Sequence, residues 1–173
     1  MSARTTSPVV LLTGCSTGIG RASAEAFRAS GATVVATARR TESIADLAAA
    51  GCETLALDVT DDASMRAAVA EVEARHGAID VLVNNAGYGQ QGAIEEVPLD
   101  RWRAQFETNV FGVVGLCQLV LPGMRERGRG RIVMVSSMGG RITFPGGAAY
   151  HASKYALEAL SDVLRYEVAR FGV

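Results

Sequence analysis

A tyrosine and a lysine four positions apart, Tyr150 and Lys154, are the residues of this sequence best suited to acid–base chemistry. The alanines and leucines around them predict a helix, on which the phenol and the ammonium share one face about one turn apart. A free phenol ionises near pH ~10 and is a poor base at neutral pH, but a fixed cation beside it favours the phenolate. The pair therefore predicts a general acid/base; the alternative is a solvated helix face.

The composition supports a specific need for the lysine. Of the 17 basic residues, Lys154 is the only lysine, and a compact ammonium can hydrogen-bond a ligand and a tyrosine together. Three further features favour a catalytic interpretation: a glycine-rich turn near the N-terminus, the tetrapeptide Asn84-Asn85-Ala86-Gly87, and a serine 13 residues before Tyr150.

The elements that must position these residues alternate between strand and helix along the chain. Apolar runs predict strands at 9–12, 33–37, 54–57, 81–83 and 131–135. Helical periodicity predicts helices through 22–29, 43–50, 61–75, 99–127 and 150–171, the third of them capped by Asp61. This alternation predicts a doubly wound α/β fold of the Rossmann type, a parallel sheet with strand order 3-2-1-4-5.

Length and composition limit the classes of protein to consider. The 173 residues suit one domain, with 49% hydrophobic and 20% charged residues. A net charge of −1 gives no basic surface for nucleic acid, and the longest near-apolar run, Val110 to Leu121, is too short to span a bilayer and predicts a buried helix. The three cysteines, Cys15, Cys52 and Cys117, fit neither a disulfide framework nor a metal site, and predict reduced thiols in a cytoplasmic protein.

The glycine-rich turn lies between a buried strand and a helix, which is the setting of a dinucleotide site. Glycines let the backbone approach a pyrophosphate, and the helix N-terminus offers free N–H groups and a positive dipole end. The alternative is a tight turn that binds nothing. The residues predicted to contact the cofactor here are Gly14, Ser16, Thr17, Gly18, Ile19 and Gly20.

Polar residues follow the other strands at the same edge of the predicted sheet, where ligands of open parallel sheets bind. Asp58 suits a hydrogen bond to an adenine amino group, or alternatively caps the next helix. Ala38 stands where NAD-preferring proteins usually carry an acid, and Arg39 follows it, which favours the 2′-phosphate of NADP over NAD. One of Arg39 and Arg40 is alternatively a solvated surface residue.

Together these residues resemble the short-chain dehydrogenase/reductase family. The segment from Met138 to Glu158 is most similar to hydroxysteroid- and retinol-dehydrogenase-like members and to bacterial carbonyl reductases. The matching segments, in the order and spacing of the family, are Thr13-Gly14-x-x-x-Gly18-Ile19-Gly20, Asp58-Val59, Asn84-Asn85-Ala86-Gly87, Asn109, Ser137 and Tyr150-x-x-x-Lys154.

The resemblance implies an NADP(H)-dependent oxidoreductase that interconverts a carbonyl and a secondary alcohol. It implies that Tyr150 donates its proton to the carbonyl oxygen and that Ser137 hydrogen-bonds the same oxygen. The distance of 13 residues to Tyr150 selects Ser137 over Ser136, because strand alternation sends the two side chains to opposite faces. Lys154 would favour the phenolate and hold the nicotinamide ribose.

The resemblance also implies a role for Asn109 and further cofactor contacts. Asn109 would disturb the long helix locally and hold a water that links Lys154 to solvent; the alternative is a polar residue that faces solvent. The remaining residues implied to bind the cofactor are Val59, Asn85, Ala86 and Gly87, with Tyr150 and Lys154.

The sequence departs from the family at Phe171-Gly172-Val173, where members continue into a sixth strand, a substrate lid and a seventh strand. We therefore expect a single domain over 1–173 that is incomplete at its C-terminus, as a fragment of a longer enzyme. The alternative is a natural truncation that relies on partner chains. The fifth strand would then lie at an exposed edge, and the identity of the substrate would be encoded outside this sequence.

Other functions are open at this point. A non-catalytic NADP-binding or redox-sensing module would keep the fold without needing the serine, tyrosine and lysine together. A sugar epimerase or dehydratase shares the tyrosine and lysine but usually brings a longer substrate domain. The resemblance further implies a small carbonyl or alcohol substrate, no metal, and a homodimer or homotetramer formed by pairing of the helices at 99–127 and 150–171.

Overall fold

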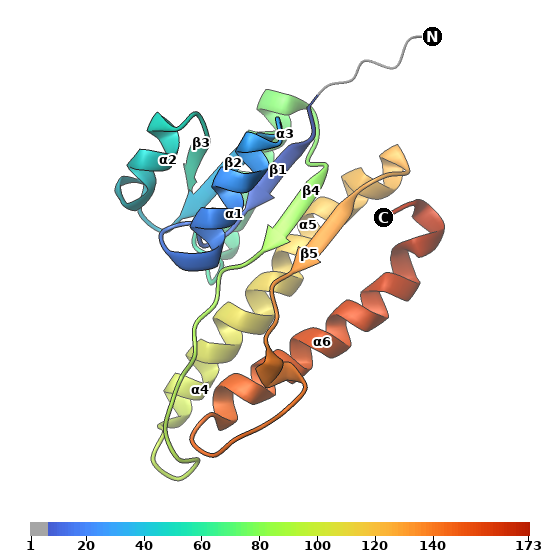
Figure 1. Cartoon of the computed structure of the whole chain (residues 1–173). Helices are drawn as coiled ribbons and strands as arrows, with labels where there is room; N and C mark the ends of the chain where they lie inside the picture. Colours follow the sequence, from blue (N-terminus) through green and yellow to red (C-terminus); the bar gives the residue numbers. More distant parts are fainter. Residues whose placement is uncertain (1–6) are drawn as a thin grey trace.

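Five short apolar runs form one parallel sheet in the computed structural model, which describes residues 7–173 (Figure 1). The strand order is β3-β2-β1-β4-β5, and every neighbouring pair is parallel. The predicted fold class and strand order are therefore confirmed. The strands are β1 (Val9–Leu12), β2 (Thr33–Ala38), β3 (Glu53–Ala56), β4 (Val81–Asn84) and β5 (Arg131–Met134).

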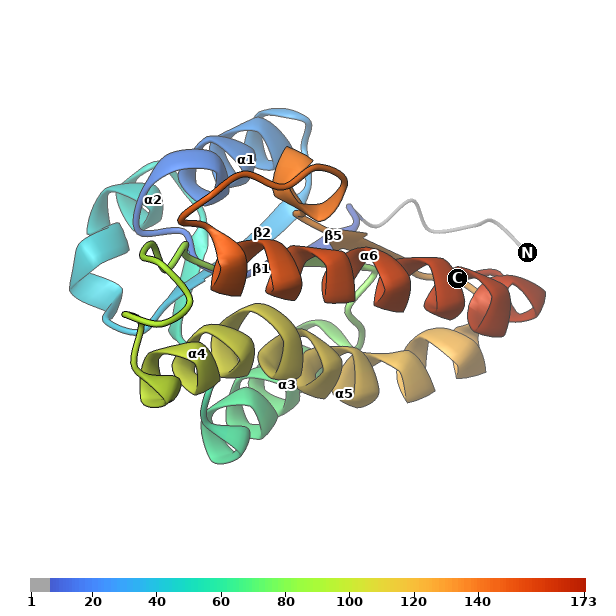
Figure 2. The same ribbon diagram turned by 90° about the horizontal axis from the view of Figure 1, so that it is seen from below.

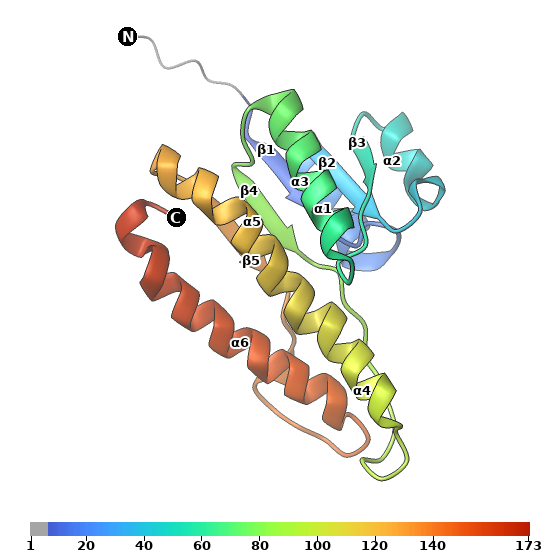
Figure 3. The same cartoon turned by 180° about the vertical axis from the view of Figure 1, so that it is seen from behind.

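Helices cover both faces of this sheet. Figure 2 shows α1 and α2 above the sheet, α3 and α5 below it and α6 crossing in front of the strands, and Figure 3 shows α3, α5 and α6 on the near side. The helices are α1 (Gly18–Ala29), α2 (Ala45–Ala49), α3 (Asp62–His76), α4 (Leu99–Phe106), α5 (Gly112–Arg127) and α6 (Ala148–Val168).

Strand alternation divides the core into two apolar clusters. Leu11 points toward α3, α5 and α6, where it packs with Leu82, Leu116 and Leu157. Leu12, one residue further, points to the opposite face and packs with residues of α1 and α2. Both faces of β1 are thus buried, as its continuous apolar sequence predicts.

Helix boundaries follow the capping signals in the sequence. Asp61 caps α3 by accepting hydrogen bonds from the backbone N–H groups of Ala63 (2.8 Å) and Ser64 (3.3 Å), as predicted. Gly77 ends the helix in the left-handed region at φ 76°. The α-helical part of α6 ends at Val168, slightly before the predicted end, and a 3-10 turn continues to Phe171.

One helical path runs from Leu99 to Arg127 through α4, a π-helical turn at Glu107–Phe111, and α5. Asn109 lies within the π turn, so the predicted local disturbance of the helix at this residue is confirmed. Within residues 7–173 this is the one helix whose length and composition would allow it to cross a membrane. Its 29 residues exceed the apolar run from Val110 to Leu121, because α4 and the π turn continue the same helical path.

Packing gives the better account of that helix. Leu116, Val120 and Met124 are almost completely buried beneath the sheet, in the same cluster as Leu11 and Leu82. The apolar side of α5 is therefore core surface.

Candidate active site

The glycines of the turn after β1 are needed for different reasons, either a positive φ or a close approach of neighbouring atoms. Gly14 and Gly18 have φ values of +71° and +57°, which glycine adopts without strain. A Cβ on Gly14 would lie 2.8 Å from Ala86 Cα, and one on Gly20 would lie 2.3 Å from the Gly14 carbonyl oxygen. The turn is thus packed tightly against β4 and α1, while nothing lies within 4 Å of the Cβ position of Gly18.

The N-terminus of α1 is available to an anion. Thr17 occupies the cap position without a side-chain hydrogen bond, and the first turn contains no acidic residue. Thr17, Gly18 and Ile19 are exposed, and Ser16 is half-buried, with its carbonyl accepting a hydrogen bond from Arg21 (3.1 Å). The free N–H groups and the positive end of the helix dipole can therefore face a phosphate.

Thr13, whose role the sequence interpretation missed, joins the glycine turn to the segment after β4. Its buried hydroxyl accepts hydrogen bonds from the backbone N–H groups of Asn85 and Ala86, both at 3.0 Å. The Asn85 side chain completes the junction by donating to the carbonyls of Thr13 (2.9 Å) and Gly14 (3.1 Å). The signal for this role was a hydroxyl residue at the end of a buried strand, directly before the first glycine.

The ends of β2 and β3 place the predicted adenosine contacts beside the turn. Cys15 donates its backbone N–H to the Thr37 carbonyl (2.9 Å), which brings the exposed Arg39 next to the glycine turn. Asp58 is half-buried, and its Oδ1 accepts from the backbone N–H (2.9 Å) and the hydroxyl (2.8 Å) of Thr60. Because Asp61 caps α3, the alternative interpretation of Asp58 as that cap is wrong.

Val59, by contrast, is part of the core. It is buried against the first residue of α5, where a Cβ on Gly112 would lie 2.5 Å from the Val59 carbonyl oxygen. Close approach of α5 to this segment thus depends on a glycine at that position.

Asn109 binds the segment that follows β4. Its side chain is 1% exposed, so the alternative of a solvent-facing residue is wrong. Oδ1 accepts from the Tyr88 N–H (3.1 Å), and Nδ2 donates to the Tyr88 carbonyl (2.9 Å) and to Ser153 Oγ on α6 (3.1 Å). A Cβ on Gly87 would lie 3.1 Å from this Oδ1, so Gly87 also packs closely against the amide.

Gln105, a second residue that the sequence interpretation missed, holds the same segment. It is completely buried, donates to the Tyr88 carbonyl (2.6 Å) and accepts from the Gln90 N–H (2.6 Å). The signal was its position four residues before Asn109, which places both amides on one side of the helix. Together the two amides fix the backbone that leads from β4 toward Tyr150.

Lys154 and Tyr150 lie on one side of α6, as their spacing predicts. Lys154 Nζ is 5.8 Å from the centroid of the Tyr150 ring and donates a hydrogen bond to the Val135 carbonyl (2.8 Å) just after β5. Burial lowers the pKa of the Lys154 ammonium from its ordinary value, and the nearby Glu158 carboxylate opposes that shift. The ammonium is therefore held at a fixed point between the sheet and the phenol.

The Tyr150 ring lies between two glycines from different loops. A Cβ on Gly89 would lie 3.5 Å from Tyr150 Cδ2, and one on Gly139 would lie 3.1 Å from Tyr150 Cε1. The Gly139 N–H donates a hydrogen bond to Ser137 Oγ (3.0 Å). Gly139 therefore hydrogen-bonds Ser137 and also packs closely against the Tyr150 ring.

The two serines after β5 behave differently, as strand alternation predicts. Ser137 Oγ accepts a hydrogen bond from the Gly139 N–H. Ser136 Oγ is buried near the Glu158 carboxylate and makes no regular hydrogen bond. The Ser136 hydroxyl, followed by Arg141, lowers the pKa of the Glu158 carboxyl. Ser136 therefore faces the ion pair between Arg141 and Glu158 (2.7 Å), away from the Ser137 side.

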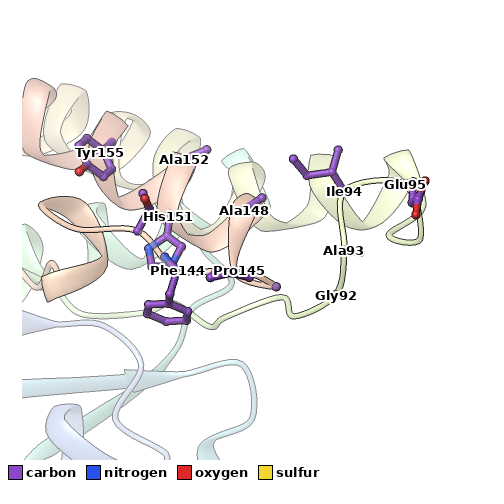
Figure 4. Close-up of a pocket in the computed structure, with 12 residues that line it drawn as sticks. Gly92, Ala93, Ile94, Glu95, Phe144, Pro145, Ala148, His151, Ala152 and Tyr155 are labelled. Atoms are coloured by element: carbon purple, nitrogen blue, oxygen red, sulfur yellow. The ribbon is translucent and has the colours of Figure 1, made fainter.

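A pocket of about 710 Å³ lies beside the N-terminal turns of α6 (Figure 4). The Gly92 N–H donates to the Gly146 carbonyl (2.9 Å), which ties together the two loops that form its walls. Tyr150 does not line the pocket, whereas its neighbour His151 does. The lining residues are Gly92–Glu95, Thr143–Gly146, Ala148, His151, Ala152 and Tyr155.

Within residues 7–173 no group of three or more His, Cys, Asp or Glu side chains is placed to hold a metal ion. At the carboxyl ends of β1, β4 and β5 the structure brings together the glycine turn, Asn85, the Tyr150–Lys154 pair and Ser137. This is the edge where open parallel sheets bind ligands.

Comparison with known proteins gives consistent matches. The chain is 44% identical over 94% of its length to the oxidoreductase BOA17 of Botryotinia fuckeliana. It is 39% identical over 95% of its length to a 3-ketodihydrosphingosine reductase of Bacteroides thetaiotaomicron. It spans 61% and 60% of the lengths of these two relatives.

Solved structures agree with the sequence relatives. A short-chain dehydrogenase from Streptomyces avermitilis is similar with a TM-score of 0.94 and 51% identity, over 96% of this chain and 63% of that one. A gluconate 5-dehydrogenase from Burkholderia cenocepacia, solved with NADP and tartrate, gives a TM-score of 0.90 and 34% identity, over 95% of this chain and 67% of that one. The family model described as short chain dehydrogenase matches residues 8–173, so the chain belongs to the short-chain dehydrogenase/reductase family of oxidoreductases.

Proposed function

We propose that this chain carries the cofactor site and the proton-transfer residues of an NADP(H)-dependent oxidoreductase that interconverts a carbonyl and a secondary alcohol. The observation that carries the proposal is the buried Lys154 ammonium, bonded to the Val135 carbonyl and 5.8 Å from the centroid of the Tyr150 ring. A cation fixed beside a phenol favours the phenolate, which is what a tyrosine needs in order to exchange a proton at neutral pH.

The residues around the glycine turn fit a dinucleotide. Gly14 and Gly18 keep the backbone at positive φ without side chains, and the N-terminus of α1 lacks both a side-chain cap and an acidic residue. That combination suits the pyrophosphate. Asp58 and the backbone of Val59 follow β3 and would contact the adenine, while Asn85, Ala86 and Gly87 follow β4 at the same edge.

NADP is the proposed form of the cofactor. Ala38 ends β2 where an acid would bind the ribose 2′-OH of NAD, and the exposed Arg39 follows it beside the glycine turn. A guanidinium pairs well with a phosphate through charge-assisted hydrogen bonds. The solved relatives that contain NADP, among them the gluconate 5-dehydrogenase, support this preference.

The bound cofactor would supply the hydride chemistry. We propose that Tyr150 gives its phenolic proton to the carbonyl oxygen in reduction and takes it back in oxidation. Ser137 Oγ, which already accepts from Gly139, keeps its own proton free to donate to the same carbonyl oxygen. Lys154 would stabilise the phenolate and hold the nicotinamide ribose.

The role of Asn109 in this proposal has two parts. Its amide orders the segment from Tyr88 and reaches Ser153 on α6. The water predicted to connect it with Lys154 stays a prediction.

A reduction assay separates this function from a non-catalytic NADP-binding module. Purified protein is mixed with NADPH and a panel of aldehydes, cyclic ketones and long-chain ketones, and NADPH absorbance is followed. The long-chain ketones are included because the pocket is mainly apolar and because one relative is a 3-ketodihydrosphingosine reductase. Oxidation of NADPH that depends on a carbonyl supports the proposal; tight NADPH binding without turnover on any substrate supports the module.

We also propose a homodimer or homotetramer in the cytoplasm. Several large apolar side chains are exposed on the Leu99–Arg127 helical path and on α6: Leu99, Phe111 in the π turn, and Val163 and Tyr166 on α6. Exposed apolar surface of this kind is common at subunit interfaces. Three free, buried cysteines support a reducing compartment.

A further inference from the structure

We propose that His151 is a positioning residue: its imidazole holds the Gly139 peptide in place and thereby orients Ser137 and Tyr150. This inference rests on the proposed function, because it assigns how two of the proposed catalytic groups are held in register. The sequence interpretation gave His151 no role.

The two ring nitrogens of His151 bind two different points of one loop. Nδ1 lies 2.9 Å from the Gly139 carbonyl oxygen, and Nε2 accepts the Phe144 N–H at 3.4 Å. A carbonyl can only accept and an N–H can only donate, so these partners require the neutral ring with its proton on Nδ1. His151 therefore fastens the loop between β5 and α6 at two points.

Burial and packing leave the ring little freedom. His151 is 2% exposed, and the Phe144 ring meets it edge-on with centroids 4.3 Å apart. A Cβ on Gly147 would lie 2.7 Å from Nε2. Figure 4 shows the imidazole directed from α6 toward Phe144 at the wall of the pocket.

The peptide that His151 holds is the one that contacts both proposed catalytic groups. The Gly139 carbonyl accepts from His151 while its N–H donates to Ser137 Oγ (3.0 Å). A Cβ at Gly139 would lie 2.8 Å from His151 Nδ1 and 3.1 Å from Tyr150 Cε1, so this glycine is enclosed by the two side chains. A displacement of Gly139 would move the Ser137 hydroxyl relative to the Tyr150 phenol.

Three variants separate this role from simple filling of space. The change His151→Asn keeps an N–H donor near the position of Nδ1 but loses much of the ring volume. The change His151→Gln places its amide further out, toward Phe144, and His151→Leu keeps apolar volume without any hydrogen bond. If the His151 ring only fills space, leucine should be its best replacement. If the ring holds the Gly139 carbonyl through Nδ1–H, asparagine should be the best replacement.

The primary readout is backbone order, which does not need turnover. In ¹⁵N-labelled protein, the ring nitrogen shifts of His151 report its tautomer, and amide exchange reports the protection of the Gly139 N–H. We expect the Nδ1–H tautomer in the unaltered protein, near-normal protection of Gly139 in His151→Asn, and exchange faster by about 10-fold or more in His151→Leu and His151→Gln. Protection of the Leu11 and Leu82 amides serves as the control for global folding.

The second readout is catalysis. We expect His151→Leu and His151→Gln to lose about 10- to 100-fold in kcat with little change in the Kd for NADPH, and His151→Asn to recover most of the loss. An Nε2–H tautomer, equal Gly139 protection in all variants, or a leucine variant at least as active as the asparagine variant would overturn the inference. If His151→Leu does not fold, the tautomer and the comparison of His151→Asn with His151→Gln still decide it.

Failure of the proposed function would look different. Turnover that survives Tyr150→Phe would remove the proposed mechanism whatever the His151 variants do. Loss of turnover in Tyr150→Phe together with unchanged Gly139 protection in the His151 variants would remove only the positioning role.

Discussion

Lys154 is a buried cation whose proposed function and contribution to stability oppose each other. Burial disfavours its charged form and lowers its pKa, even with Glu158 nearby. Lys154 therefore binds its proton less tightly in the folded chain than in the unfolded chain. For Tyr150, the proposed proton donor, this fixed ammonium is a partner that a phenol in water does not have.

The sign of that shift predicts a pH dependence. Between the lowered pKa of Lys154 and the ordinary lysine value of ~10.5, the unfolded chain binds more protons than the folded chain, so stability rises with pH in that window. The free energy of unfolding of the unaltered chain minus that of Lys154→Met should therefore be flat near neutrality and increase toward pH ~10.5. Urea unfolding over a pH series measures it, and a difference that decreases with pH would contradict the lowered pKa.

Arg39 is the residue to which we attribute the proposed preference for NADP. Arg39 is exposed directly after β2, and a charge-assisted bond to a 2′-phosphate contributes about 1.5–3 kcal/mol, or about 10- to 100-fold in Kd. We expect Arg39→Asp to weaken NADPH binding by that factor and to improve NADH binding, as measured by fluorescence titration. The neighbouring Arg40, also exposed, provides the control, because Arg40→Asp makes the same charge change. Equal effects of the two changes would contradict a specific role for Arg39.

At the scale of elements, the helix from Leu99 to Arg127 holds the segment after β4 through two buried amides. Asn109→Leu would leave the Tyr88 N–H without its partner, and Gln105→Leu would do the same to the Gln90 N–H. Each change should cost about 1–3 kcal/mol in the free energy of unfolding, measured by urea unfolding.

A control for this loss lies in the same turn. Thr108 is half-buried, and its hydroxyl donates only to the Ala104 carbonyl one turn earlier (3.2 Å), so Thr108→Ala should change stability by less than about 0.5 kcal/mol. If Asn109→Leu is as mild as Thr108→Ala, the amide does not hold the Tyr88 segment in the way described.

Local sequence signals were sufficient to predict the elements and the sheet. Apolar runs located all five strands, and Asp61 and Gly77 marked the ends of α3. The local disturbance of the helix at Asn109, observed as a π turn, was implied only by the family resemblance. Small differences at the ends of β5 and α6 arise because the last hydrogen bonds depend on neighbouring elements.

The site was predictable only in part, and the missed residues share a cause. Thr13, Gln105 and His151 each bind backbone atoms of a loop that is distant in sequence or irregular in shape. Spacing can mark the residue, as it does for Gln105 four positions before Asn109, but it does not identify the backbone group that the residue binds, because that depends on where two segments meet after folding. The spacing of Tyr150 and Lys154 on one helix, in contrast, fixed their relation locally.

At the scale of the whole molecule, β5 lies at one edge of the described sheet, paired with β4 alone, and Val133 on it is 39% exposed. Phe111 in the π turn and Tyr155, Val163 and Tyr166 on α6 are also exposed apolar or aromatic side chains. The chain spans about 60% of the length of the two relatives described above. An unpaired strand edge and exposed apolar side chains are surfaces against which a further segment or a second chain can pack.

Light scattering combined with size exclusion tests the proposed oligomer. We expect a dimer or tetramer, and a shift toward monomer when Tyr166, which is 83% exposed on α6, is replaced by glutamate, because burying a carboxylate at an apolar interface is unfavourable. Ile94→Glu, at a residue 71% exposed in the loop after β4, is the control and should leave the assembly unchanged. A monomeric unaltered chain would contradict the proposed assembly.

The most direct test of the central claim compares the unaltered protein with Tyr150→Phe in NADPH-dependent reduction of a carbonyl, alongside NADPH binding measured on the same samples. Removing one hydroxyl leaves the ring between Gly89 and Gly139 and the Lys154 contact with Val135 in place. We predict that NADPH binds with nearly the same Kd while kcat falls by about 10²-fold or more, the contribution expected of a general acid. A Tyr150→Phe variant that turns over as fast as the unaltered protein would contradict the account.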